Sequence, residues 1–296
     1  MINMNEKTVL AALIMVLAAS GCLQNSIYPV PGADYASRPD PYYTIDDFNT
    51  TEYAEVYKVA YQSRGATIYG LLSVPHSCKE DRPCDAFVLL PADSITKESE
   101  QKWLGNKLNS MGFITLAIDQ RGIGETGGSV PSLKENFATW AAGRETTQSM
   151  MVYDALAAYD LLLSRPETKG VYLEGESMGG RQAIIAGAIE RGVKGLLLIS
   201  TSGYGLPETP YQNMTDFLAY IDPDSYIGEI SPRKILMIHG TGDWVISPEV
   251  AKRTYGFAKP PKKFILVEGK FHGYYHVTNT TLPQLLEDSV MGWLLG

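Results

Sequence analysis

Few residues in this sequence are suited to binding metals, redox groups or nucleic acids. The 296 residues include three cysteines and four histidines, and these show no spacing typical of a metal site. Lysine and arginine form no cluster and the formal net charge is −8, so the basic face that binds nucleic-acid phosphates is missing. We therefore expect no metal, no organic cofactor and no nucleic-acid partner.

The N-terminal apolar run is too short to cross a bilayer. It extends over residues 8–20 after Lys7 and has the length of the apolar region of a signal peptide. Ala19-Ser20-Gly21-Cys22 is similar to the lipobox of exported lipoproteins, although Ala19 stands where leucine is commoner. We expect a signal peptide over 1–21, with Cys22 as the lipidated residue. Plain secretion is the alternative.

This interpretation predicts an exported protein at the cell surface or envelope, with a lipid as its only contact with the membrane. Residues 22–52 are rich in proline and small polar residues, which is typical of an extended tether. Residues 53–296 are expected to form one domain.

Cys78 and Cys84 remain after Cys22 and flank a polar, proline-containing segment between two expected strands. Outside the cytosol, this spacing suits a disulfide that closes a short loop. The alternative is two unpaired thiols.

Short apolar runs, typical of strands buried on both faces, alternate with helical patterns along the domain. Strands are expected at 56–61, 67–74, 86–90, 113–118, 171–175, 195–200, 235–239 and 263–267, and helices at 98–111, 146–164, 248–257 and 282–295, with a further helix after 171–180 that includes 181–186. This alternation predicts a mainly parallel, doubly wound α/β sheet with helices on both faces. Residues 203–232 are expected to hold two short helices and thus only a minimal cap.

The segment Gly175-Glu176-Ser177-Met178-Gly179 has the G-x-S-x-G pattern of a nucleophile elbow. In such a turn, the serine adopts a strained backbone conformation and its hydroxyl stands over a helix N-terminus. The simpler alternative is a tight strand-to-helix turn in which Ser177 only caps the helix.

Titratable residues follow two later strands at the same end of the expected sheet. Asp243 comes after strand 235–239, and His272 comes after strand 263–267. The chain order Ser177, Asp243, His272 is the order found in α/β-hydrolases, and a serine nucleophile needs such a base and acid.

Other residues compete for these roles. His276 is an alternative base, and Asp222 and Asp224 are alternative acids, although the two aspartates lie outside any strand-end loop. Asp243 could instead be a turn residue, and His239 is expected to be structural or to line the pocket wall.

From Val56 to Leu295 the chain resembles the α/β-hydrolases, in particular the group that contains dienelactone hydrolases, prolyl-oligopeptidase-like enzymes and acetyl-xylan-esterase-like enzymes. Besides the elbow, residues 119–126 are similar to the D-x-R-G-x-G-x-S motif of this group, and residues 238–243 resemble its acid loop. The resemblance implies a serine hydrolase with Ser177, Asp243 and His272 as its catalytic residues.

The expected oxyanion hole departs from the pattern of the group. Where these proteins commonly have His-Gly, this chain has Pro91-Ala92-Asp93. Proline has no N–H to donate, so we expect the backbone N–H groups of Asp93 and Met178 to bind the oxyanion.

The function expected from these residues is hydrolysis of a carboxylic ester through an acyl-enzyme on Ser177. A serine peptidase is the alternative. An aminopeptidase would need an acidic pocket for the substrate's amino group, for which Glu125, Glu174 and Glu176 are available. A third possibility, from another class, is an inactive surface-anchored binding protein on a hydrolase fold.

Overall fold

A nine-stranded sheet forms the centre of the protein in this computed structural model, which describes residues 38–206, 210–274 and 282–295. The strand order is β1-β2-β3-β5-β4-β6-β7-β8-β9. The strands are β1 Tyr43–Thr50, β2 Ala54–Ser63, β3 Ala66–Pro75, β4 Cys84–Leu90, β5 Ile114–Ile118, β6 Thr168–Glu176, β7 Gly195–Ile199, β8 Lys234–Gly240 and β9 Lys262–Val267. The expected signal peptide, Cys22 and His276 lie outside the described residues.

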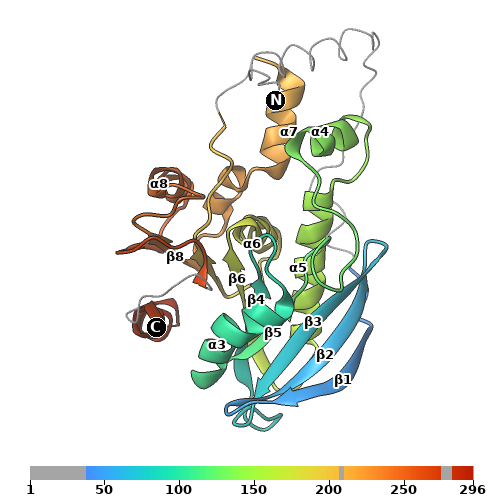
Figure 1. Cartoon of the computed structure of the whole chain (residues 1–296), viewed down its shortest axis with the longest axis vertical. Coiled ribbons are helices and arrows are strands. Elements are labelled where there is room, and N and C mark those ends of the chain that lie inside the picture. The colour runs from blue at the N-terminus through green and yellow to red at the C-terminus, as the bar shows by residue number, and fades with distance from the viewer. Residues whose placement is uncertain (1–37, 207–209, 275–281, 296) are drawn as a thin grey trace.

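Parallel pairing dominates the sheet from β5 to β9, whereas β1, β2 and β3 form an antiparallel edge. Strands β5, β6 and β7 are almost entirely buried because helices cover both of their faces. The predicted mainly parallel, doubly wound sheet is therefore confirmed (Figure 1).

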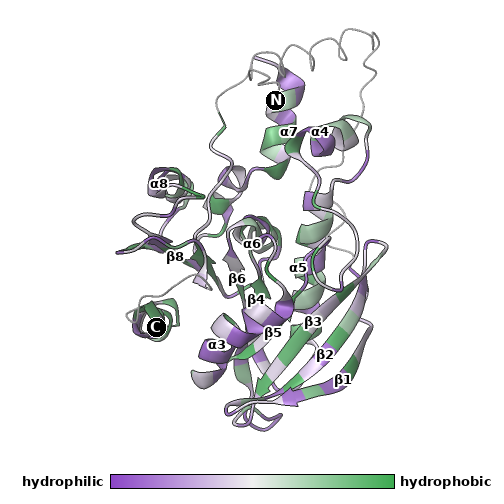
Figure 2. Cartoon of the chain, in the orientation of Figure 1, coloured by the Kyte–Doolittle hydropathy of each residue, from purple (hydrophilic) through white to green (hydrophobic). Residues whose placement is uncertain are grey.

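Helices α5 and α6 pack on one face of the sheet, and the helical segments before β5 and after β9 cover the other. Figure 2 shows hydrophobic segments along the sheet strands and hydrophilic residues on α3. The helical elements are α2 Lys97–Glu100, η2 Gln101–Gly105, α3 Asn106–Ser110, α4 Leu133–Ala141, α5 Thr147–Leu163, α6 Met178–Ile189, α7 Gln212–Ile221, η3 Pro223–Ser225, η4 Ile227–Glu229, α8 Pro248–Phe257, α9 Leu282–Ser289 and η6 Val290–Leu294. Within the described ranges, no helix combines the length and apolar character that crossing a membrane requires.

The interpretation of residues 22–52 as a tether is wrong for residues 43–50, because these form β1. All but the first of the β1 residues are exposed, so the strand has no buried apolar face that a sequence pattern could reveal. Backbone pairing with β2 holds it instead. Just before β1, Arg38 Nη2 donates to Asp160 and to Glu190, at 2.8 Å in each case, which fixes this segment to the helical layer.

The cap consists of α4 and α7, which lie side by side beyond the sheet (Figure 1). Phe137 and Trp140 of α4 pack against Phe217 and Tyr220 of α7 in a separate apolar cluster. Ser132 starts α4 with a capping box to Glu135. No helix was predicted over the residues of α4, so half of this small cap was not expected.

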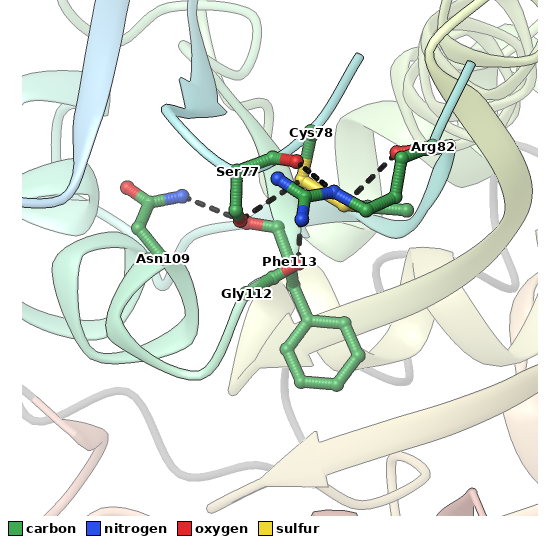
Figure 3. Close-up of a disulfide and its surroundings, with 7 residues drawn as sticks. Ser77, Cys78, Arg82, Asn109, Gly112 and Phe113 are labelled. Atoms are coloured by element: carbon green, nitrogen blue, oxygen red, sulfur yellow. Dashed lines mark hydrogen bonds between the residues drawn. A yellow bond between two sulfur atoms is a disulfide. The ribbon is translucent and has the colours of Figure 1, made fainter. Parts of the chain in front are cut away.

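The predicted disulfide between Cys78 and Cys84 is confirmed. It closes a tight turn in which the backbones of Lys79 and Arg82 bond to each other in both directions. Figure 3 shows Arg82 in this loop, where its Nε donates to the Ser77 carbonyl at 2.8 Å. The bridge joins the end of β3 to the start of β4.

Candidate active site

Ser177 stands at the turn between β6 and α6, with φ 49° and ψ −111°. A non-glycine residue in this region is strained, as expected for a nucleophile elbow. Two glycines make the turn possible: a Cβ on Gly175 would come within 2.6 Å of the Gly179 backbone, and one on Gly179 would come within 1.8 Å of the Leu90 carbonyl oxygen. The Ser177 hydroxyl makes no capping hydrogen bond to α6, so it is available for another partner.

That partner is His272, whose Nε2 lies 2.7 Å from the Ser177 Oγ. On the other side of the ring, Nδ1 lies 2.9 Å from Asp243 Oδ2 and 3.1 Å from Oδ1. A carboxylate accepts hydrogen bonds, so Nδ1 carries the proton and Nε2 is the acceptor for the serine hydroxyl. The structure thus joins the three predicted residues from three separate loops.

Asp243 is buried, and its environment favours the carboxylate. Burial opposes ionisation, but hydrogen bonds from His272 and from the backbone of Ile246 and Val245 hold the pKa of Asp243 below its usual value. The N–H groups of Val245 and Ile246 donate to Oδ1 at 2.9 and 3.0 Å. This turn fixes the carboxylate in the orientation that His272 requires.

His239 supports the same carboxylate, a role that the sequence did not reveal. Its Nε2 donates to the Ile246 carbonyl at 2.8 Å and lies 3.3 Å from Asp243 Oδ2. Burial lowers the pKa of His239 and keeps the ring neutral near pH 7. The expectation that His239 is structural is therefore correct, and its structural role is to hold the acid loop.

The competing acids have other partners. Asp222 Oδ1 accepts the backbone N–H of Asp224 at 3.0 Å at the start of η3. Asp224 forms an ion pair with Arg253 at 3.1 Å. Neither aspartate contacts His272, whereas Asp243 does.

The two expected oxyanion donors, Asp93 and Met178, line the same cavity as Ser177. Two residues before Asp93, the carbonyl of Pro91 accepts a hydrogen bond from the Gln120 side chain. This contact holds the loop after β4 in place, although the sequence here differs from the His-Gly of the related proteins.

The cavity above Ser177 has a volume of about 360 Å³. Its described apolar lining includes Val130, Leu133, Met151 and Ile246. Arg181 lies one helical turn after Ser177 and stacks on the Tyr204 ring at 4.2 Å, while its Nε donates to the Ser202 carbonyl. The described lining thus combines apolar side chains with several polar ones, which include Thr147, Gln148 and Gln182.

The acidic residues considered for an aminopeptidase lie elsewhere. Glu125 pairs with Lys58 and Lys97. Glu174 and Glu176 are buried and are not among the described lining residues of the cavity. Asp93 is the one carboxylate among those lining residues.

The sheet topology, the strained serine turn and the order of the three site residues define an α/β-hydrolase fold with a Ser-His-Asp arrangement at the carboxyl ends of its strands. Comparison with known proteins agrees. Residues 98–235 match the family model described as serine aminopeptidase, S33, which is a hydrolase family.

Two solved structures similar to this chain are acetyl xylan esterases. Acetyl xylan esterase 1 from Thermoanaerobacterium sp. JW/SL YS485 has a TM-score of 0.65 and 20% identity, over 91% of this chain and 95% of that one. The acetyl xylan esterase from Paenibacillus sp. R4 has a TM-score of 0.67 and 20% identity, over 89% and 90% of the two chains. These similarities confirm the predicted α/β-hydrolase fold.

A curated relative is the uncharacterized protein YfhR of Escherichia coli O157:H7. It is 28% identical over 169 residues, which are 54% of this chain and 53% of the relative. The chain therefore aligns with about half the length of this relative. Together, the fold and the family match support a hydrolase.

Proposed function

We propose that the protein hydrolyses carboxylic esters through an acyl-enzyme on Ser177. The observation that carries the proposal is the continuous contact from the Ser177 hydroxyl to His272 and from His272 to Asp243. A serine hydroxyl becomes a nucleophile when a neighbouring base accepts its proton. Asp243 holds His272 in the tautomer that can do so.

In the first half of the reaction, His272 Nε2 takes the proton as the Ser177 oxygen attacks the ester carbonyl. The N–H groups of Met178 and Asp93 bind the resulting oxyanion. The protonated His272, stabilised by Asp243, then gives its proton to the leaving alkoxide, and the acyl group remains on Ser177. In the second half, His272 takes a proton from water, whose oxygen attacks the acyl-enzyme. The bond to Ser177 then breaks, the Ser177 oxygen takes the proton back from His272, and the acid leaves.

We propose that the ester substrate carries a short acyl group. The cavity is small, and apolar side chains form much of its described lining. Two proteins of similar fold are named for acetyl esters, which supports the same preference in this chain.

Labelling with a fluorophosphonate probe, followed by a panel of 4-nitrophenyl esters, tests the proposal. We expect the probe to modify Ser177, and we expect kcat/KM for the acetate or butyrate ester to exceed that for the decanoate by at least about tenfold, because a cavity of about 360 Å³ leaves little room for the added methylenes. A folded protein that neither reacts with the probe nor hydrolyses any ester would instead be a binding protein on a hydrolase fold.

A serine peptidase is the second candidate, because the matching family model is described as an aminopeptidase. In this chain the substrate's amino group would have to meet Asp93. Aminoacyl 4-nitroanilides measured beside the esters separate the two functions. Turnover of the anilides that is faster than that of the esters, and lost on Asp93→Asn, would establish the peptidase.

For the cellular location, we propose export and lipid anchoring at Cys22. Support comes from the lipobox-like residues 19–22 and from the Cys78–Cys84 disulfide, a bond that persists mainly in oxidising compartments. Metabolic palmitate labelling is expected for the wild-type protein and absent in Cys22→Ala. Labelling that persists in this variant would contradict the anchor without affecting the proposed chemistry.

A further inference from the structure

Three buried glutamates lie together behind the serine elbow. Glu174 and Glu176 are two residues apart on β6, so their side chains project from the same face of the strand. Glu100 joins them from α2, and one carboxylate oxygen of each residue lies within 4.8 Å of the other two. The exposed fraction is 3% for Glu100, 0% for Glu174 and 1% for Glu176.

Glu176 connects this cluster to the loop that carries His272. Its Oε1 accepts a hydrogen bond from the backbone N–H of Tyr274 at 2.7 Å. Gly273 packs against its other oxygen: the residue has φ +80°, and a Cβ there would lie 2.7 Å from Glu176 Oε2. Because Glu176 also precedes Ser177 directly in the chain, one side chain links the serine elbow to both residues that follow His272.

Glu176 is also the member of the cluster that can ionise near neutral pH. Burial raises its pKa to about 7, against the hydrogen bond from Tyr274 and the charge of His272, which lower it. Burial and the neighbouring carboxylates raise the pKa values of Glu100 and Glu174 well above the usual range. The titratable groups facing Glu176 are therefore Glu174 on its own strand, Glu100 on α2, and His272 and Tyr274 on the loop.

Two of these acids, Glu100 and Glu174, have little in their surroundings to offset a negative charge. Within the described part of the chain, Oε1 of Glu100 has no hydrogen-bond partner, and the backbone of Leu90 is the one group that favours ionisation of Glu174. An isolated buried carboxylate is too costly to remain ionised, so it takes up a proton or binds a cation. With Glu100 and Glu174 protonated, Glu176 can carry a negative charge close to His272.

We propose that Glu176 is a positioning residue for the base: it braces the His272 loop through the Tyr274 N–H and, when ionised, stabilises the imidazolium that forms on His272 during ester hydrolysis. The second part rests on the proposed function, because it needs His272 to accept a proton in the reaction. The brace does not depend on that function.

Three variants separate the two parts. Glu176→Gln keeps an oxygen that can accept from Tyr274 but cannot carry charge, whereas Glu176→Ala removes both the acceptor and the charge. Glu100→Gln is the matched control, since Glu100 belongs to the same buried cluster, is itself neutral and is not bonded to the loop. Thermal unfolding of each variant checks that it folds.

We expect Glu176→Gln to lower kcat about tenfold at pH 8.5, where wild-type Glu176 is ionised, with KM unchanged within about twofold. At pH 6 the wild-type carboxyl is mostly protonated, so the loss in kcat should shrink to about twofold. The kcat of Glu176→Ala should be about 100-fold below that of the wild type, and the kcat of Glu100→Gln should stay within about twofold of it at both pH values. A wild-type to Glu176→Gln ratio that does not change with pH would overturn the electrostatic part.

Amide hydrogen exchange of residues 271–274 tests the brace without any substrate. Exchange at Tyr274 should become at least about tenfold faster in Glu176→Ala and stay near the wild-type rate in Glu176→Gln; equal rates in all variants would overturn the brace. If wild-type protein shows no Ser177-dependent hydrolysis, the proposed function fails, whereas the exchange result still decides the brace. A rise in melting temperature with Ca²⁺ or Mg²⁺ that disappears in Glu174→Gln would show that the cluster binds a cation. It would contradict the inference that Glu100 and Glu174 are protonated.

Discussion

Replacing Ser177 with alanine is expected to lower kcat/KM for a short acyl ester by at least about 10⁴-fold. The substitution removes the only atom that can form the acyl-enzyme, while His272, Asp243 and the oxyanion donors remain in place. The measurement is the initial rate with a 4-nitrophenyl ester, together with fluorophosphonate labelling, which should be absent.

The control for this variant is Ser110→Ala. Ser110 is an exposed residue at the end of α3, its hydroxyl donates to the Lys107 carbonyl, and it is not among the described residues that line the cavity. Its activity should equal that of the wild type. Ester hydrolysis that survives in Ser177→Ala, with the protein folded and free of contaminating esterase, would remove Ser177 from the mechanism.

Replacing Gly179 with alanine is expected to destabilise the protein by about 3 kcal/mol and to abolish most of the activity. The added Cβ would lie 1.8 Å from the carbonyl oxygen of Leu90 and 2.7 Å from that of Pro91. Both contacts are with backbone, so relief requires α6 and the end of β4 to separate. This movement would also displace Ser177 from His272 and shift the loop that carries Asp93.

Chemical denaturation and ester hydrolysis measure the two effects, with Gly256→Ala as the matched control. A Cβ at Gly256, in α8, would meet nothing within 4 Å. Alanine is a better helix former than glycine, so this control should gain up to about 0.5 kcal/mol and keep full activity. A Gly179→Ala protein with wild-type stability and activity would mean that the elbow is looser than its contacts indicate.

The two variants test different requirements of the same turn. The Ser177→Ala variant tests the need for the nucleophile, because it is expected to keep the fold. The Gly179→Ala variant tests the need for the elbow geometry, because it keeps the three site residues but forces their supporting backbone apart. Agreement between them would connect the strained conformation of Ser177 to its reactivity.

Backbone requirements made the elbow predictable from sequence. A strand-to-helix turn this tight needs residues without Cβ atoms at 175 and 179, and such residues leave a visible pattern. Buried parallel strands likewise need continuous apolar runs, so the order of strands and helices after residue 53 could be predicted. The disulfide was predictable because Cys78 and Cys84 are close in the chain.

Contacts between distant residues left no such pattern. Strand β1 depends on backbone pairing with β2, which almost any exposed sequence can provide. The contact of His239 with the acid loop, and that of Glu176 with Tyr274, depend on where loops meet in space. In the sequence, each of these residues is only a titratable side chain near a strand end.

The sequence by itself determined the alternating α/β architecture, the position of the strained serine and the chain order of serine, acid and base, because local periodicity and glycine geometry encode these features. The tertiary structure decided that Asp243, not Asp222 or Asp224, faces His272, and that this histidine reaches a serine 95 residues earlier in the chain. It also gathered Glu100, Glu174 and Glu176 behind that serine. Hydrogen bonds and buried charges act over a few ångströms in space, and only the folded chain sets those distances.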